Sequence, residues 1–136
     1  MSTVAVVYWS GTGNTEAMAQ AVCQGAKEAG AAAELFEAGD FDASKVAGFD
    51  SLAFGCPAMG AEELEEDVFR PMWDGCKGGL AGKNLVLFGS YGWGDGEWME
   101  SWKEEATGTV VDTYICTETP GEEELAACKA LGAKLA

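Results

Sequence analysis

Histidine is absent from this chain of 136 residues, and that absence alone excludes several kinds of active site. Without an imidazole there is no Ser-His-Asp triad, no Cys-His nucleophile pair and no histidine-bearing metal site. Basic residues are also scarce, since 8 lysines and arginines stand against 23 acids and give a net charge of −15. A field of that sign repels phosphate backbones and acidic lipids, so we expect neither nucleic acid nor a membrane as a partner.

The sequence also lacks C-x-x-C pairs and any apolar run near the roughly 20 residues that a membrane span needs. Apolar residues make up 48% of the chain, so we expect a single domain over residues 1–136 with one core. The number of cysteines is odd, and the chain enters an apolar run at once with no signal peptide pattern. We therefore expect free, mostly buried thiols in a reducing cytoplasm, at Cys23, Cys56, Cys76, Cys116 and Cys128.

Short apolar runs alternate with helical patterns along the whole chain. This alternation, with short connections, predicts a parallel sheet between two layers of helices. Pro71 lies inside the helical pattern of Leu64, Val68 and Met72, and we expect it to kink or end that helix. The expected strands cover 4–8, 32–36, 50–55, 85–89 and 110–116, and the other expected helices cover 14–29, 98–106 and the residues from 122 onward.

Ligands of such sheets bind outside the carboxyl ends of the strands, and the first loop there suits a phosphate. Residues 10–15 read Ser-Gly-Thr-Gly-Asn-Thr and join the first strand to the first helix. The helix N-terminus offers unpaired N–H groups, and the glycines let the backbone close on an anion. The loop lacks the lysine of a nucleoside-triphosphate loop and the third glycine of a dinucleotide fingerprint. It therefore suits one terminal phosphate held by neutral donors, with an ordinary capped turn as the alternative.

Two further loops carry side chains suited to a flat ring. After the third strand, Met59 is polarizable, Gly60 permits a backbone flip and Glu62 can accept a hydrogen bond from an imide-type N–H. After the fourth strand, Tyr91 and Trp93 stand between glycines, where large aromatic groups are costly to leave uncovered. Taken singly, these segments could be a plain loop and a local aromatic cluster. Together with the first loop they describe a ring whose side arm ends in one phosphate, which is flavin mononucleotide (FMN).

The chain resembles the flavodoxins. The resemblance rests on Ser-Gly-Thr-Gly-Asn-Thr at 10–15, Met-Gly-Ala-Glu at 59–62 and Gly-Ser-Tyr-Gly-Trp-Gly at 89–94. It is most similar to the short-chain, clostridial-type members, because the strand at 110–116 runs without the long insertion of the other class. The resemblance implies an α/β three-layer sandwich whose five-stranded parallel sheet has the order 2-1-3-4-5. It also implies FMN as the non-covalently bound cofactor.

The resemblance assigns the phosphate end of FMN to the loop at 10–15, helped by Ser90, with Trp9 beside the ribityl chain. Pro57 stands where related proteins often have a serine that donates to the phosphate. Because proline has no N–H or hydroxyl to donate, we expect that contact to be missing.

The resemblance assigns the ring to the other two loops, between Met59 on its inner face and Trp93 on its outer face. Backbone N–H groups at Gly92 and Trp93 would face the pyrimidine edge, and Glu62 would accept from N3–H. No catalytic or metal-binding residue is expected. The complete expected set of cofactor-binding residues is Trp9, Ser10, Gly11, Thr12, Gly13, Asn14, Thr15, Pro57, Ala58, Met59, Gly60, Ala61, Glu62, Ser90, Tyr91, Gly92, Trp93 and Gly94.

The implied function is low-potential, one-electron carriage between redox enzymes in place of ferredoxin. Carboxylates near the flavin disfavour its anionic, fully reduced form, and five acids lie beside the second loop, at Glu62, Glu63, Glu65, Glu66 and Asp67. A solvated helix face is the alternative reading of this acidic run.

The implied partners are redox enzymes with basic docking patches, such as ferredoxin-type oxidoreductases, flavodoxin reductases and hydrogenase- or nitrogenase-type acceptors. We expect a monomer. The alternative function is an FMN-dependent quinone or disulfide reductase, and a maturation or interaction protein is a third. We prefer the carrier because the chain has no histidine proton donor and no room for a nicotinamide site.

Overall fold

The computed structural model describes residues 3–11, 13–57, 64–91, 97–117 and 120–136. Its centre is a five-stranded parallel sheet in the order β2-β1-β3-β4-β5, which confirms the predicted topology. The strands are β1 (Thr3–Tyr8), β2 (Ala32–Glu37), β3 (Ser51–Gly55), β4 (Asn84–Tyr91) and β5 (Thr109–Thr117). The helices are α1 (Asn14–Glu28), α2 (Ala43–Val46), α3 (Phe69–Cys76), α4 (Glu97–Glu105) and α5 (Glu122–Ala133), with 3-10 turns at Ala38–Asp40 and Lys77–Gly79.

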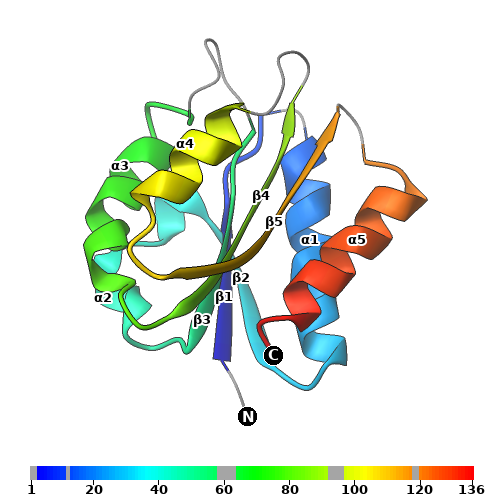
Figure 1. Ribbon diagram of the computed structural model, residues 1–136, viewed down its shortest axis with the longest axis horizontal. Helices are drawn as coiled ribbons and strands as arrows, with labels where there is room; N and C mark the ends of the chain where they lie inside the picture. Colours follow the sequence, from blue (N-terminus) through cyan, green and yellow to red (C-terminus); the bar gives the residue numbers. More distant parts are fainter. Residues whose placement is uncertain (1–2, 12, 58–63, 92–96, 118–119) are drawn as a thin grey trace.

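Helices cover both faces of the sheet, with α1 and α5 on one side and α2, α3 and α4 on the other (Figure 1). Alternate residues of each strand point to opposite faces, so a buried strand supplies two cores at once. In β1, Val4 and Val6 pack in the core under α1 and α5. Ala5 and Val7 belong to the core on the other face, which holds the buried aromatic residues of α3 and α4. The apolar run that predicted this strand is therefore buried on both sides.

Helix α3 begins later than the sequence pattern suggested, and the expected kink at Pro71 is wrong. The helix starts at Phe69, so Pro71 is its third residue and the helix continues unbroken to Cys76. The first N–H groups of a helix have no intrahelical acceptor, so proline loses nothing in that turn. Leu64 is buried but lies before the helix and not on its first turn.

Helices α1 and α5 touch backbone to backbone through two glycines. A Cβ atom at Gly25 would lie 2.0 Å from the carbonyl oxygen of Lys129, and one at Gly132 would lie 1.9 Å from that of Val22. No other residue fits at either position without moving a helix. This contact fixes α1 on the sheet and so sets where its N-terminus lies.

All five cysteines are buried and free, as the sequence predicts. Burial raises the pKa of the Cys56 thiol and of the Cys128 thiol to about 12 in each case. Because the thiolate is the reactive form, burial disfavours reaction at these two thiols. Across the described ranges, no helix combines the length and the apolar character that crossing a membrane requires.

Candidate functional site

The loops singled out by the sequence leave the sheet from three neighbouring strands. Strand β3 pairs with β1 on one side and with β4 on the other. The hydrogen-bond ladder continues past the strand ends, since Trp9 N–H donates to the Gly55 carbonyl at 3.0 Å and Cys56 N–H to the Phe88 carbonyl at 3.1 Å. The carboxyl edge of β1, β3 and β4 is therefore the candidate site, at the point where the strand order reverses.

The first loop ends in a helix N-terminus that no described side chain caps. Gly13 precedes α1 with φ at 93°, a left-handed conformation that glycine reaches without strain. Ser10 turns back into the loop, where its Oγ accepts a hydrogen bond from Gly13 N–H at 2.9 Å. The first N–H groups of α1, beginning at Asn14, are therefore available to an anion, which the helix dipole also favours.

A buried pair of hydroxyl groups lies at this helix N-terminus. Thr15 Oγ1 and Ser90 Oγ are 3.2 Å apart, and the two residues are 1% and 5% exposed. One hydroxyl proton is used in their mutual hydrogen bond, and the second makes no hydrogen bond among the described residues, so a ligand could accept it. This contact also joins the loop after β1 to the end of β4. The site thus offers several donors and no cation, which fits a single phosphate.

A hollow of about 400 Å³ lies beside the first loop, lined by Tyr8, Trp9, Ser10, Glu16 and Glu37 among others. The Tyr8 hydroxyl donates to Glu16 Oε2 at 3.1 Å. Burial, together with Glu16 and Glu37, raises the pKa of Tyr8 to about 12, so the phenol stays protonated. Carboxylates here accept hydrogen bonds from hydroxyl groups and repel a second phosphate.

Half of the expected cofactor-binding residues can be placed. The structure brings the described first-loop residues and Ser90 together at the carboxyl edge, and places Trp9, Pro57 and Tyr91 at the ends of the same three strands. The described members are Trp9, Ser10, Gly11, Gly13, Asn14, Thr15, Pro57, Ser90 and Tyr91. The members that lie outside the described residues are Thr12, Ala58, Met59, Gly60, Ala61, Glu62, Gly92, Trp93 and Gly94.

The side chain of Tyr91 is less exposed for contact with a ligand than its position between glycines suggested. It is the last residue of β4 and half-buried, and its ring centroid lies 5.4 Å from that of Trp98 on α4. The tyrosine ring therefore packs against the buried Trp98, and the residue belongs to the strand and not to the loop.

Glu65 has a role that the sequence did not reveal. It is 6% exposed, and its carboxylate accepts hydrogen bonds from the N–H groups of Asp67, Val68 and Phe69, each at 2.8 Å. Burial raises the pKa of Glu65, but the three N–H donors outweigh burial and hold that pKa below its usual value. The solvated acidic helix face considered from sequence is thus wrong for Glu65, which caps the start of α3 instead. Pro71, a first-turn residue, was the available signal that the helix starts near Phe69.

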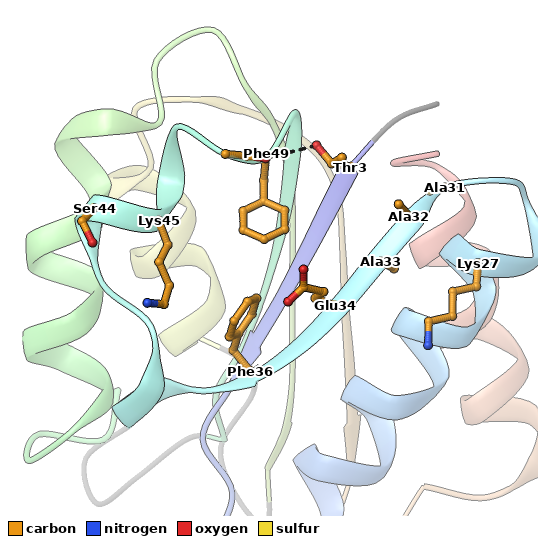
Figure 2. Close-up of a pocket in the computed structure, with 11 residues that line it drawn as sticks. Thr3, Lys27, Ala31, Ala32, Ala33, Glu34, Phe36, Ser44, Lys45 and Phe49 are labelled. Carbon is orange, nitrogen blue, oxygen red and sulfur yellow. Dashed lines mark hydrogen bonds between the residues drawn. The ribbon is translucent and has the colours of Figure 1, made fainter.

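A second hollow, of about 660 Å³, lies over the edge strand β2 (Figure 2). Lys27, Glu34, Phe36, Lys45 and Phe49 are among the residues that line it. None of the expected site residues does so, and the hollow includes Thr3 and Ala32, the first residues of β1 and β2. It is therefore separate from the candidate site at the carboxyl edge.

The chain is similar to known proteins in both sequence and fold. The sequence model of the family described as Flavodoxin matches residues 6–130. The flavodoxin of Megasphaera elsdenii is 49% identical over 132 residues, which is 95% of each chain. The flavodoxin of Clostridium beijerinckii is 40% identical over 134 residues, covering 96% of this chain and 97% of that one. The solution structure of two-electron reduced Megasphaera elsdenii flavodoxin superposes with a TM-score of 0.88 at 47% identity, covering 96% of this chain and 98% of that chain.

Proposed function

The chain belongs to the flavodoxin family of FMN-binding electron carriers, and we propose that it shuttles single electrons at low potential between redox enzymes, in place of ferredoxin. It is an electron-transfer protein and not an enzyme, and the alternative of an FMN-dependent quinone or disulfide reductase is not favoured. FMN, when bound, supplies the redox chemistry. The residues of this chain bind that cofactor, shield it and set the free energy of each of its charge states.

The phosphate of FMN is assigned to the first loop and the hydroxyl pair. The observation that carries this assignment is the uncapped N-terminus of α1 beside Thr15 and Ser90. Neutral donors suffice for a phosphate at a helix N-terminus. Trp9 is half-buried, and a Cβ at Gly11 would lie 3.1 Å from its Cη2 atom, so the indole lies against the loop where the ribityl chain would pass. Pro57 contributes no donor to the phosphate.

The flavin ring is assigned to the segments around Met59 and Trp93. Support comes from the strands that precede them, because β3 pairs in parallel with β4 up to Gly55, opposite Phe88, and β4 continues from there to Tyr91. The ring would then lie between the two side chains, with Glu62 accepting from N3–H, as the resemblance to flavodoxins implies.

The charge of the protein favours a low potential. A carboxylate about 10 Å from the ring disfavours an added negative charge by about 0.4–0.8 kcal/mol at a dielectric of about 40–80. Glu66 and Asp67 are exposed in the turn that precedes α3, and the net charge of −15 adds a field of the same sign. Together such groups lower the second reduction potential, since about 1.4 kcal/mol corresponds to about 60 mV for one electron.

Replacing Gly60 tests the assignment of the ring. We propose that the Gly60–Ala61 peptide unit turns its carbonyl toward flavin N5 after the first electron and proton are taken up. Because the turned state needs a positive φ, Gly60→Ala is expected to lower the first reduction potential by about 40–80 mV. Affinity for oxidised FMN is expected to stay as in the wild type. Spectroelectrochemistry measures the potential, and an unchanged first potential in Gly60→Ala would rule out the peptide switch.

Partner docking is expected to depend on charge. We infer that basic patches of redox enzymes recognise the acidic surface through transient contacts. Stopped-flow electron transfer to a basic acceptor such as cytochrome c is therefore expected to slow as ionic strength rises from about 20 to about 300 mM. Transfer to a small neutral quinone is the control and is expected to stay constant. Equal salt dependence for both acceptors would contradict docking by charge.

We further propose that residues 1–136 form one domain that acts as a monomer in the reducing cytoplasm. The five free thiols support the compartment, since such thiols persist where disulfides are rare. The net charge of −15 supports the monomer, because two copies repel each other.

A further inference from the structure

The hollow over β2 contains two aromatic rings that the fold already holds in place (Figure 2). Phe36 and Phe49 are half-buried and pack edge to face with ring centroids 5.8 Å apart, and both rings lie against that of the buried Phe41. Lys83 Nζ donates a hydrogen bond to the Phe49 carbonyl at 2.7 Å, which fixes the backbone of that residue. A preformed hollow of about 660 Å³ lies within the range of about 300–1,000 Å³ that is typical of small-molecule sites.

Two lysines at this hollow have no acceptor among the described residues. Lys27 lies on α1 and Lys45 on α2, and within the described ranges neither side chain makes an ion pair or a hydrogen bond. The remaining basic side chains each contact an acceptor, and they are Arg70, Lys77, Lys83, Lys103, Lys129 and Lys134. The two basic side chains that the described fold leaves without an acceptor therefore line one hollow, in a protein whose net charge is −15.

Lys45 is the cation on the aromatic side of the hollow. Figure 2 shows Lys45, Phe36 and Phe49 on one side of β2 and Lys27 on the other side. A molecule that covers the two rings therefore lies close to Lys45, and Lys27 acts on it only across the strand. Aromatic rings favour a flat apolar body, and an ammonium group favours a negative charge. This side of the hollow thus combines the two features that recognise an apolar anion.

The carboxylates around Lys45 favour a ligand with a single negative charge. The Asp42 carboxylate accepts hydrogen bonds from the backbone N–H and the hydroxyl of Ser44, so it is already used. Glu34 also lines the hollow, and no ion pair joins it to a lysine in the described part of the chain. Because Glu34 repels a second negative charge, a monoanion fits this hollow better than a dianion does.

We propose that the hollow over β2 is a second ligand site, which binds a small monocarboxylate with a flat apolar body. The apolar body lies against Phe36 and Phe49, and the carboxylate points toward Lys45. The site is separate from the carboxyl edge of the sheet, where the flavin is assigned, and it goes beyond electron transfer. Binding there requires no displacement of FMN, so both ligands occupy the protein together.

Titration of the FMN-loaded protein with 2-naphthoate, followed by backbone amide NMR shifts, tests the proposal. The neutral 2-naphthamide has the same rings without the charge, and the bound FMN keeps both probes out of the flavin site. Shifts are expected at Ala32–Glu34, Lys45 and Phe49 and not on α5. Naphthoate is expected to bind about threefold more tightly than naphthamide, which is the factor for one solvent-exposed ion pair.

Substitutions of exposed charged residues change the binding of naphthoate in opposite directions. Lys45→Gln is expected to abolish the preference for naphthoate over naphthamide, and Glu34→Gln to raise it about twofold. Lys103→Gln is the matched control, since it removes the same charge from an exposed lysine on α4 that pairs with Glu100 at 4.0 Å. Phe49→Leu is expected to weaken both probes about fivefold, because the ring that they share is lost.

Shifts confined to the hollow, with a preference for naphthoate that Lys45→Gln abolishes and Lys103→Gln keeps, support the second site. Equal binding of the two probes to wild type, no shift with either probe, or shifts spread over the surface would overturn it. Shifts at β2 that grow with protein concentration when no probe is present would also overturn it. The free edge of β2 would then pair with a second copy of the chain.

Discussion

The apoprotein is expected to bind FMN about a thousandfold more tightly than riboflavin, which lacks only the phosphate. Hydrogen bonds to a charged group contribute about 1.5–3 kcal/mol each, and the N-terminus of α1 with the Thr15–Ser90 pair offers several. Repulsion from the net charge of −15 offsets part of this gain. A remaining difference of about 4 kcal/mol corresponds to the thousandfold ratio. FAD is expected not to bind, because its second phosphate would lie near Glu16 and Glu37.

Isothermal calorimetry on apoprotein measures these affinities, and two variants locate the effect. Thr15→Val keeps the shape of the side chain, and Ser90→Ala removes a single oxygen, so both leave the backbone donors of α1 in place. Each is expected to weaken FMN about tenfold or more and to leave riboflavin almost unchanged. Equal affinity of the wild type for FMN and riboflavin would show that the phosphate of FMN does not bind at this loop.

Gly132→Ala is expected to cause a large loss of stability for the addition of a single methyl group. The new Cβ would lie 1.9 Å from the Val22 carbonyl oxygen, so α5 must move away from α1. Overpacking of this kind costs about 1–3 kcal/mol and occasionally more, and the clash here is with backbone, so we expect about 3 kcal/mol. Urea unfolding followed by circular dichroism measures the change.

Gly75→Ala provides the matched control for the same substitution. Gly75 is exposed on α3, and a Cβ there would meet no atom within 4 Å. Because alanine is the better helix former, this variant is expected to gain about 0.5–1 kcal/mol. A loss of unfolding free energy in Gly132→Ala and a gain in Gly75→Ala would show that α1 and α5 approach closely at Gly132. A Gly132→Ala protein as stable as wild type would show that the helices do not touch at this point.

The strands and α1 could be predicted because their signals are local and repeated. The apolar run at β1 is buried on both faces, and α1 is slightly more than four turns long. Helix α2, at Ala43–Val46, is too short to show a period and was not predicted. The start of α3 was misplaced because Leu64 and Val68 fit a helical spacing although they precede the helix. Leu64 is buried and Val68 is exposed, so their helical spacing does not reflect a common helix face.

The phosphate end of the site could be predicted because its glycines and hydroxyls are neighbours in the sequence. The contact between Thr15 and Ser90 joins residues 75 positions apart, so its geometry depended on the fold. The same holds for Glu65, whose role as a helix cap follows from its burial and from the late start of α3. An acidic run is read from sequence as charge, but the fold decides that Glu65 serves as a helix cap and Glu66 faces solvent.

A spectroelectrochemical titration of the FMN-loaded protein tests the central claim most directly. A one-electron carrier holds each of the two electrons with a different free energy, since the acidic surroundings penalise the second negative charge more than the first step. We expect two separate one-electron steps, the second at a clearly lower potential than the first. A single two-electron step, as an enzyme that handles hydride equivalents would show, would contradict the assignment of this protein as a one-electron carrier.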